Sequence, residues 1–417
     1  MDNKTNNEIL RSLKLASREL RLKDSSYRKK VLLDLACIID EQRSEIVIAN
    51  QKDILAAEKN NLSSAMIDRL LLDDKRIDSM INSVNEIANY GDILGSIIQQ
   101  KQHSQGFMIY KTTVSIGVIF VIYESRPNVT IDTAALAIKS GNAILLKGGK
   151  EASFSNRALV ECIYKALIKN SYPKSGVHLL DSSNREEINY FLKADKYIDL
   201  VIPRGGEGLV NAVVSNSTIP VIKHYKGVCH IYVEKTADLT MAQNIIVNAK
   251  CQRPGVCNAV ETILIDDEIA ENFLPQLCSI LEASGVEIRG DKSCQNICPQ
   301  IITATEEDWS AEYLDLILSI KIVKGLSDAA NHIEEFGSHH SDSIISSDES
   351  VINQFFSLID SAVVYSNAST RFTDGGEFGL GAEVGISTDK IHARGPMGIE
   401  GLTTYKWVVR GSGNIRD

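Results

Sequence analysis

The sequence predicts an α/β protein with two lobes, each built on a parallel sheet with helices on both faces. The segment 114–222 alternates short apolar runs with helical patterns, and a second alternating series runs from about 228 to 366. Nearly continuous apolar strands separated by helices are typical of parallel sheets that are buried on both faces. A chain of 417 residues is also too long for one ordinary core, so two or three lobes are expected.

The first lobe is expected to follow a helical N-terminal region. Residues 1–100 are predicted to be helical because their apolar residues recur at helical spacing. The run VSIGVIFVI then predicts one buried strand over 114–122. A helix over 132–140, a strand over 142–147 and a long helix over 152–170 continue the alternation.

The second lobe is expected to begin beyond a hinge near 223–228. Its helices are predicted over 238–250 and 267–284, and its strands include 260–265 and 361–366. The same strand–helix alternation as in the first lobe predicts a second parallel sheet.

The tail after residue 370 is rich in glycine, but it carries Phe, Val, Ile, His, Arg and Met between the glycines. A solvated linker would not carry such side chains, so an ordered loop that crosses an active site or a lobe interface is expected. The strand TTYKWVVRG follows it. The predicted domains are therefore 1–225, 226–366 and 367–417.

Composition limits the classes of partner. The formal net charge of −10 argues against nucleic acid or an anionic membrane as a partner. No apolar run reaches membrane-spanning length and the N-terminus is polar, so a cytoplasmic protein is expected. The eight cysteines are not expected to form disulfides there. Because C-x-x-C is absent, no metal site is predicted.

Two glycine turns follow predicted strands of the first lobe, 204-RGGEGLV-210 and 147-KGGKEA-152. Backbone N–H groups at a helix start can bind phosphate, and two such turns at strand ends favour a dinucleotide. Neither turn is G-x-G-x-x-G, so tight strand–helix turns are an equal alternative. Lys147 and Lys150 would either meet a ribose phosphate or be solvated.

Cys257 lies in the segment 251-CQRPGVCNAVETILI-265, in a loop before a predicted strand, whereas Cys251 lies at a helix end. Loops at element ends expose reactive groups, and the nearby Arg253 would lower the pKa of a thiol. Cys257 is therefore a candidate nucleophile, with an inert buried thiol as the alternative. Asn128 would either cap a helix or donate to a developing oxyanion.

Several segments resemble those of the γ-glutamyl phosphate reductases, within the aldehyde dehydrogenase superfamily. The matching blocks run from about 66 to 410 and include GVIFVIYESRPNVTIDTAALAIKSGNAILLKGGKEA, VIPRGGEGLV, NAKCQRPGVCNAVETILI and HARGPMGIEGLTTYKWVVRG. The resemblance implies an aldehyde dehydrogenase-like fold. Its parts would be N-terminal helices with a Rossmann-type NADP-binding lobe, a second α/β catalytic lobe, and a Gly-rich active-site loop with a small oligomerisation element, in the order of the three predicted domains.

The activity implied by the resemblance is an NADPH-dependent reduction. L-Glutamyl 5-phosphate would be converted to L-glutamate 5-semialdehyde and phosphate, the second step of proline biosynthesis from glutamate. Cys257 in QRPGVCNA would form a thioester with the substrate. Asn128 would hold the oxyanion together with the backbone N–H of Cys257.

The resemblance also assigns residues to the cofactor. Lys147 would meet the adenosine ribose, Gly205 and Gly206 the pyrophosphate, and Glu312 the nicotinamide ribose. One departure concerns the glutamate that activates water in hydrolytic aldehyde dehydrogenases, because 222-IKHYKGVC-229 has His224 near its place. Without that glutamate the thioester would be kept from hydrolysis. His224 would be either an acid/base group or an ordinary polar residue.

The substrate carries a phosphate, an α-carboxylate and an α-ammonium. Arg126, Arg253 and Arg394 are candidates for the anions, because guanidinium groups match such oxygens. Glu124 or Asp132 would meet the ammonium. Each of these residues is equally a candidate for a structural ion pair.

The resemblance and the apolar C-terminal strand together predict a homo-oligomer. They leave open whether the protein binds glutamate 5-kinase, which supplies the substrate. The alternatives for function are another aldehyde or acyl-CoA dehydrogenase on the same scaffold, and a catalytically silent scaffold subunit.

Overall fold

The computed structural model describes residues 3–181, 184–223 and 226–416. Its contacts divide the chain into two compact units. Unit 1 comprises Met1–Lys223, Gly379–Gly385 and Met397–Asp417, and unit 2 comprises His224–Phe378 and Ile386–Pro396. Both units contain parallel sheets and helices, so the predicted α/β fold is confirmed. The segment predicted as a third domain is divided between the two units.

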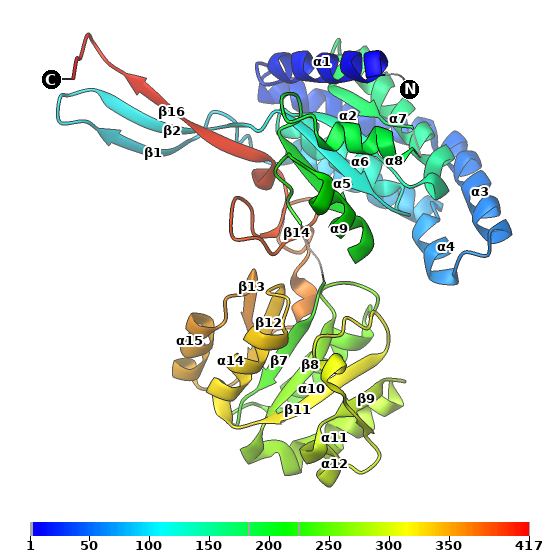
Figure 1. Cartoon of the computed structure of the whole chain (residues 1–417), viewed down its shortest axis with the longest axis vertical. Helices are drawn as coiled ribbons and strands as arrows, with labels where there is room; N and C mark the ends of the chain where they lie inside the picture. The colour runs from blue at the N-terminus through cyan, green and yellow to red at the C-terminus, as the bar shows by residue number, and fades with distance from the viewer. Residues whose placement is uncertain (1–2, 182–183, 224–225, 417) are drawn as a thin grey trace. The chain divides into compact units, whose positions relative to one another are not determined.

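The described residues of unit 1 form nine α-helices, five before the first strand and four after it (Figure 1). The first five are α1 (Asn3–Leu20), α2 (Ser25–Glu41), α3 (Arg43–Lys59), α4 (Ser64–Leu70) and α5 (Asp74–Asn89). The others are α6 (Asn128–Lys139), α7 (Ser153–Lys169), α8 (Arg185–Leu192) and α9 (Glu207–Asn216). Helices α2 and α5 pack against α6, and α2 and α3 pack against α7.

The central sheet of unit 1 has four parallel strands in the order β5-β4-β3-β6. The strands are β3 (Val118–Tyr123), β4 (Ala143–Lys147), β5 (Val177–Leu179) and β6 (Leu200–Arg204). All six residues of β3 are buried, as expected of an inner strand with both faces covered. The carboxyl ends of β4, β3 and β6 lie side by side at one edge, where ligands bind in sheets of this kind.

The strand predicted over 114–122 is wrong in its extent. The run is divided between β2 (Met108–Ser115) and β3, which belong to different sheets. Gly117, at the break, has φ +137°, and a β-carbon there would lie 2.2 Å from a carboxylate oxygen of Asp199. Only glycine accommodates this bend, so the chain changes sheets at this point. The helical prediction for residues 1–100 is also wrong at its end, where β1 (Ile97–Gln102) begins.

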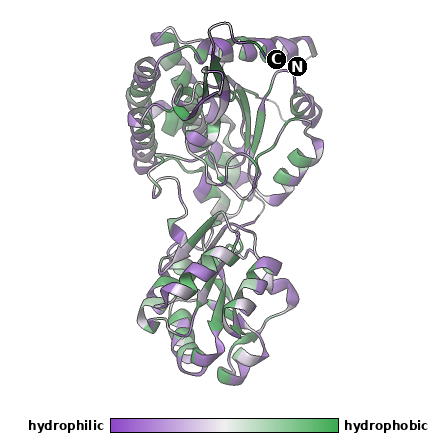
Figure 2. Ribbon diagram, turned by 90° about the vertical axis from the view of Figure 1, so that its left-hand side faces the viewer, coloured by the Kyte–Doolittle hydropathy of each residue, from purple (hydrophilic) through white to green (hydrophobic). Residues whose placement is uncertain are grey.

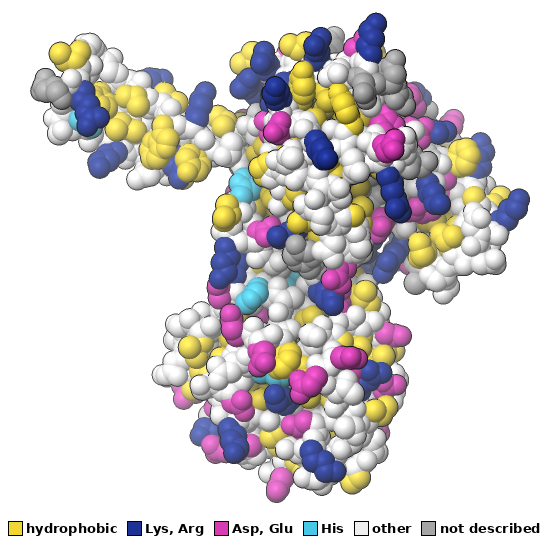
Figure 3. Space-filling view, in the orientation of Figure 1, with side chains coloured by type: hydrophobic (Ala, Val, Ile, Leu, Met, Phe, Trp, Pro, Cys, Tyr) yellow, Lys and Arg dark blue, Asp and Glu magenta, His cyan; other side chains and the backbone are white. Residues whose placement is uncertain are grey.

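A second sheet of unit 1 is antiparallel, with the order β1-β2-β16. Strand β16 (Thr403–Arg410) confirms the predicted C-terminal strand. Large apolar side chains lie exposed on this sheet, and Figure 3 shows apolar side chains gathered on its surface. They are Ile97, Ile98, Tyr405, Trp407 and Val409.

Unit 2 contains seven parallel strands in the order β10-β9-β11-β8-β7-β12-β13. They are β7 (Cys229–Val233), β8 (Val260–Asp266), β9 (Glu287–Gly290), β10 (Ile302–Thr303), β11 (Ile317–Val323), β12 (Ser341–Ile345) and β13 (Val363–Ser366). The helices are α10 (Leu239–Cys251), α11 (Asp267–Ala283), α12 (Lys292–Ile297), α13 (Glu306–Trp309), α14 (Gly325–Phe336) and α15 (Glu349–Leu358).

The sheet of unit 2 has an apolar core on each face. Along β8, Ile263 and Ile265 belong to the core shared with α10 and α11. Leu264 points the other way and belongs to the core shared with α14 and α15. Figure 2 shows the hydrophobic residues concentrated in the strands. Burial of both faces explains why these strands are apolar throughout.

The glycine-rich tail passes from unit 2 to unit 1, back to unit 2 and again to unit 1. Within unit 2 it forms a short antiparallel pair, β14 (Ile386–Ser387) with β15 (Gly395–Pro396). Gly379, Gly381 and Gly395 have positive φ, which glycine adopts without strain. Among the helices of the described residues, none has the length and apolar character needed to cross a membrane.

Candidate active site

The loop that carries Cys257 connects the end of α10 to the start of β8 in unit 2. Cys257 is half-buried, and the next residue anchors the loop. The buried Asn258 donates from Nδ2 to the carbonyl oxygen of Thr373 at 2.8 Å. Its own carbonyl oxygen accepts from Thr370 Oγ1 at 2.7 Å. Residues of the 370–373 turn, far along the chain, therefore fix the conformation beside the thiol.

The other side of the Cys257 backbone is closely packed. A β-carbon at Gly227 would lie 1.9 Å from the Cys257 carbonyl oxygen, so only glycine fits there. The thiol of Cys229, which is fully buried, donates to the same carbonyl oxygen at 3.2 Å. These contacts leave the Cys257 backbone little freedom to move.

A buried ion pair joins the two ends of the Cys257 loop. Lys250, near the end of α10, lies 2.5 Å from a carboxylate oxygen of Glu261 on β8, and both side chains are fully buried. Burial raises the pKa of Glu261 to about 7, while Lys250 has the opposite effect. Because neither side chain is exposed to solvent, each charge depends on the other for compensation.

Glu312 lies beside the same loop. Its Oε1 accepts a hydrogen bond from the backbone N–H of Gly227 at 2.8 Å. Two residues further on, Leu314 N–H points to Glu261 Oε1 at 3.4 Å, with a left-handed φ of +54°. A positive φ is unfavourable for leucine and occurs where the surroundings enforce it. The hydrogen bond from Gly227 holds Glu312 beside the Cys257 loop, and the contact of Glu312 with the nicotinamide ribose stays a prediction.

Arg371 lies near Cys257 and near Arg253, which belongs to the same loop as Cys257. Burial and the neighbouring charge of Arg253 lower the pKa of Arg371, while Asp374 and the thiols of Cys257 and Cys229 oppose this. Arg371 donates from Nε to Gln252 at 2.8 Å. Within the described part of the chain, neither arginine makes an ion pair. Two such guanidinium groups form an electropositive environment for a thiolate or an anion.

Arg394, by contrast, is engaged elsewhere in unit 2. Its guanidinium lies 2.6 Å from a carboxylate oxygen of Asp360, which also pairs with Lys390. The hydrogen bonds from these two cations lower the pKa of Asp360 to about 2. Arg394 thus occupies the structural ion pair that the sequence left open as its alternative role.

Asn128 in unit 1 does not cap its helix. The N-cap position of α6 is occupied by Pro127, without a side-chain capping bond. Instead, Asn128 donates from Nδ2 to Asp132 Oδ2 at 2.8 Å, one turn along the same helix. An amide nitrogen carries two hydrogens, so one N–H remains for a ligand. Burial raises the pKa of Asp132 to about 6, against the hydrogen bonds from Asn128 and Ser83 and the charge of Arg204.

The chain between β3 and α6 carries the other predicted residues of this region. The carboxylate of Glu124, an exposed residue, accepts from the backbone N–H of Gly206 at 2.9 Å. Ser125 has φ +42°, and both its N–H and its hydroxyl donate to Glu151. Arg126 follows, half-buried. Glu124 therefore bridges the ends of β3 and β6.

The two glycine turns lie at the carboxyl ends of β4 and β6. A β-carbon at Gly205 would meet the Glu124 carboxylate at 2.4 Å, and Gly206 is the N-cap of α9. Lys147 ends β4 and donates to the carbonyl oxygen of Gly148. Burial lowers the pKa of Lys147, and Glu151 and Asp181 oppose this. A helix N-terminus with glycines and a neighbouring lysine fits the phosphates of a dinucleotide.

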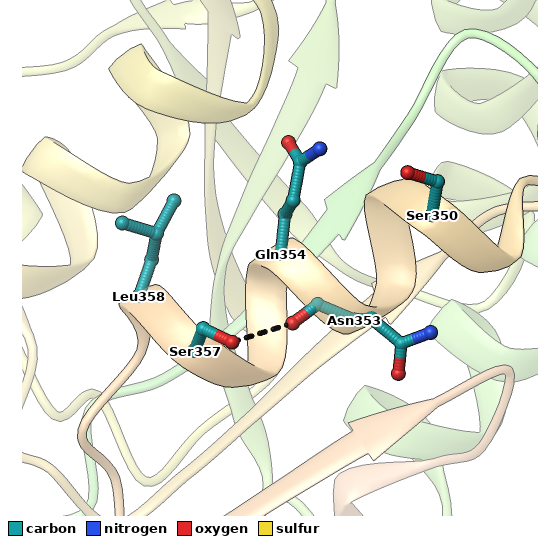
Figure 4. A pocket seen from close by; sticks show the side chains of 5 residues that line it. All are labelled: Ser350, Asn353, Gln354, Ser357 and Leu358. Atoms are coloured by element: carbon teal, nitrogen blue, oxygen red, sulfur yellow. Dashed lines mark hydrogen bonds between the residues drawn. The ribbon is translucent and has the colours of Figure 1, made fainter.

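His224 lies outside the described residues. The pocket in Figure 4 is lined by five residues of α15 alone, Ser350, Asn353, Gln354, Ser357 and Leu358. None of these five side chains is an acid, a base or a thiol. The pocket offers no group for the chemistry considered above.

Parallel sheets with glycine turns at their strand ends, and a half-buried cysteine in a tightly held loop, define an oxidoreductase of the aldehyde dehydrogenase class. Residues 1–309 match the aldehyde dehydrogenase family model. The γ-glutamyl phosphate reductase of Nautilia profundicola is 51% identical over 410 residues, covering 98% of this chain and 100% of the relative. That of Caldanaerobacter subterraneus is 49% identical, covering 97% of each chain.

Solved structures agree with this relationship. The γ-glutamyl phosphate reductase of Thermotoga maritima has a TM-score of 0.96 and 44% identity, covering 98% of this chain and 99% of that one. An acetylating aldehyde dehydrogenase of Geobacillus thermoglucosidasius, at 18% identity and a TM-score of 0.71, shares the fold. The chain belongs to the aldehyde dehydrogenase family and, within it, to the γ-glutamyl phosphate reductases. The predicted family is confirmed.

Proposed function

We propose that the protein reduces L-glutamyl 5-phosphate to L-glutamate 5-semialdehyde and phosphate, with NADPH as reductant. The observation that carries the proposal is 51% identity, over nearly the full length of both chains, to a protein named for this reduction. The reaction is the second step of proline biosynthesis from glutamate. A biosynthetic enzyme of this kind would be cytoplasmic.

Cys257 is proposed as the nucleophile. Its thiolate attacks the acyl carbon, the bond from that carbon to the phosphate oxygen breaks, and phosphate leaves with the bonding electrons. NADPH, when bound, would supply the hydride that the acyl carbon of the resulting thioester accepts. The carbon–sulfur bond then breaks, which releases the aldehyde and restores the thiolate.

The negative charge that develops on the acyl oxygen needs donors. The free N–H of the Asn128 amide and the backbone N–H of Cys257 are proposed for this role. The hydrogen bond from Asn128 to Asp132 supports the assignment, because it fixes the orientation of the amide. His224 is proposed as an acid/base group.

The leaving phosphate is proposed to bind Arg253 and Arg371. Arg371 lies near both Cys257 and Arg253, and neither arginine forms an ion pair with a carboxylate within the described residues, which supports an anion site. The sequence did not predict Arg371 as a site residue, because only the tertiary fold brings the 370–373 turn beside the Cys257 loop. Arg126 is proposed as a further anion contact.

NADPH is proposed to bind unit 1 at the carboxyl ends of β4 and β6. Gly205 and Gly206 would approach the pyrophosphate and Lys147 the adenosine ribose, where a phosphate would restore the ordinary pKa of a half-buried lysine. Glu312 is proposed for the nicotinamide ribose. This set fits a phosphorylated dinucleotide.

The test is the reaction run in reverse, since acyl phosphates are labile. NADP reduction with L-glutamate 5-semialdehyde should require phosphate, and arsenate should substitute for it. NAD should serve less well than NADP. A rate that depends on coenzyme A and not on phosphate would favour the acyl-CoA dehydrogenase alternative. A rate that does not change when phosphate, arsenate or coenzyme A is added would overturn the acyl-phosphate assignment.

A homo-oligomer is also proposed, with the β1-β2-β16 sheet as the contact surface. Every residue of β1 is exposed, and β16 exposes Tyr405, Trp407 and Val409 (Figure 3). Apolar side chains gathered in this way mark protein–protein contacts. Binding of glutamate 5-kinase is a further proposal, and co-purification of the two proteins would test it.

A further inference from the structure

The amino-acid end of the proposed substrate carries an ammonium and a carboxylate on one carbon. Two side chains of opposite charge in unit 1, Asp132 and Arg204, are suited to this pattern. We propose that Asp132 binds the α-ammonium and Arg204 the α-carboxylate of the substrate. The inference rests on the proposed function, because it specifies how the same substrate is recognised.

Asp132 is a carboxylate without a cationic partner. It is half-buried and accepts hydrogen bonds from Asn128 at 2.8 Å and from the Ser83 hydroxyl at 3.4 Å, both of which are neutral donors. Within the described chain it makes no ion pair. Removing a carboxylate from water is unfavourable unless a cation compensates it. A ligand ammonium would supply that cation.

Glu124, the other carboxylate considered for the ammonium, is in a different situation. It is exposed, and its Oε2 already accepts from the backbone N–H of Gly206. Its role is to connect the strand ends at the glycine turn. The structure therefore favours Asp132 over Glu124 as the ammonium ligand.

Arg204 ends β6 beside Tyr123, the last residue of β3, and α6, which carries Asp132, begins five residues after Tyr123. The charge of Arg204 acts on the Asp132 carboxyl group and lowers its pKa against the effect of burial. The two do not form an ion pair with each other. In the described structure the ion pair of Arg204 is a contact with Glu383 at the long distance of 4.0 Å. Gly385 lies against the guanidinium, where a β-carbon would come within 3.0 Å of Nη1. A cation and an anion that act on each other without forming an ion pair together are complementary to a zwitterionic group placed between them.

Asp132 also lies next to the proposed oxyanion donor, Asn128. One N–H of the Asn128 amide is fixed by Asp132, and the other is the proposed oxyanion donor. The proposed ammonium ligand, Asp132, therefore contacts the same amide nitrogen that is proposed to hold the acyl oxygen. A short carbon chain such as that of glutamate would extend from one to the other.

The experiment compares three aldehydes in the phosphate-dependent direction. L-Glutamate 5-semialdehyde carries both charged groups, 5-oxopentanoate lacks the ammonium, and 4-aminobutanal lacks the carboxylate. For the unmodified protein, kcat/KM should be lower by at least about 100-fold for each analogue, the scale of an unpaired buried charge. Asp132→Asn should abolish discrimination against 5-oxopentanoate alone, and Arg204→Gln discrimination against 4-aminobutanal alone.

The substitution by asparagine keeps an oxygen that can accept from Asn128, so the oxyanion donor stays oriented. Cyclisation of the amino aldehydes is the same for every variant and cancels when variants are compared. Asp40→Asn and Arg76→Gln remove charges from exposed ion pairs of unit 1, and both should keep the discrimination of the unmodified protein.

Equal loss of kcat/KM for all three aldehydes in Asp132→Asn would overturn the assignment of Asp132. If Arg204→Gln raised the KM for NADP and left the aldehyde preference unchanged, the guanidinium would belong to the cofactor site. The proposed role of Arg204 in binding the α-carboxylate would then be overturned. Failure of the unmodified protein to use phosphate with L-glutamate 5-semialdehyde would overturn the proposed function itself, and this inference with it.

Discussion

At the scale of single residues, Cys257 and Cys251 differ in surroundings although both are half-buried. Burial raises the pKa of the Cys251 thiol, which lies at the end of α10. Cys257 lies near the charge of Arg371 and has a backbone fixed by Gly227 and Asn258. Only Cys257 therefore has both the electrostatic and the geometric support that a nucleophile needs.

Cys257→Ala is expected to abolish phosphate-dependent turnover, because no other thiol is held in its place. Cys251→Ala should retain most of the turnover, since it removes only a half-buried thiol at a helix end. Steady-state rates of the two variants, at equal content of folded protein, provide the comparison. Similar losses in both would contradict the distinct roles.

Asp132 leads to a prediction about stability and pH. Its folded pKa of about 6 lies above the ordinary value, so between pH 4 and pH 6 the folded state binds more protons than the unfolded state. Stability is therefore lost as the pH rises through this window. Above pH 6 the full penalty, up to about 3 kcal/mol, is present. Asp132→Asn should raise the melting temperature at pH 8 and show a shrinking advantage towards pH 4.

Thermal unfolding at several pH values measures this effect. A lower melting temperature for Asp132→Asn than for the unmodified protein at pH 8 would mean that the carboxylate stabilises the empty protein. If the prediction holds, Asp132→Asn should both weaken substrate discrimination and raise the melting temperature at pH 8. Such a trade-off between function and stability is common at binding sites.

The sequence predicted some of these residues and not others. Cys257 and the glycine turns could be placed because helix, loop and strand patterns surround them directly. Arg371 and Arg204 could not, because their significance depends on neighbours that only the tertiary fold supplies. Glu124 and Asp132 were equivalent as acidic residues in one motif, and only burial and hydrogen bonding distinguish them.

At the scale of elements, the Cys257 loop depends on the ion pair that joins its two ends. Lys250→Met leaves the Glu261 carboxylate buried without compensation, so a loss of about 3–5 kcal/mol in the free energy of unfolding is expected. The double variant Lys250→Met with Glu261→Leu removes both charges and should recover much of that loss. Chemical denaturation of the single and double variants measures both values.

A matched control exists in the same unit. Lys235 and Glu268 form an ion pair of 2.7 Å that is exposed to solvent. Lys235→Met should cost less than about 1 kcal/mol, because water compensates the remaining charge. If both lysine substitutions had the same effect, burial of the Lys250–Glu261 pair would not be important for the loop.

Elements were predicted well where hydrophobic periodicity was uniform. The strands of unit 2 are buried on both faces and are apolar throughout, so their positions follow from the sequence. The division of 114–122 into β2 and β3 was missed, because its apolar pattern continues through the break. The cause is a close approach of Gly117 to Asp199, a contact between distant parts of the chain.

At the scale of the whole molecule, the exposed apolar sheet of unit 1 predicts self-association. Trp407→Ser should reduce the molar mass in solution, because Trp407 lies 55% exposed on β16 and would lose its contacts with a second copy. Light scattering coupled to size-exclusion chromatography measures the mass. Ile391→Ser, at a more exposed apolar residue of unit 2, is the control and should leave the mass unchanged.

The division of the chain into two units was expected from its length and from the two alternating series. The return of the tail to unit 1 was not, because no local pattern indicates which sheet a strand joins. Strand β16 pairs with β2, nearly three hundred residues earlier in the sequence. Pairings of this kind are set by the fold and not by neighbouring residues.

The central claim is that Cys257 carries the acyl group as a thioester. Rapid mixing of the protein with L-glutamate 5-semialdehyde and NADP in phosphate-free buffer tests it most directly. The account predicts a burst of one NADPH per active site, followed by a stall that added phosphate relieves, and no burst in Cys257→Ala. Continued turnover without phosphate, or a full burst in Cys257→Ala, would contradict it.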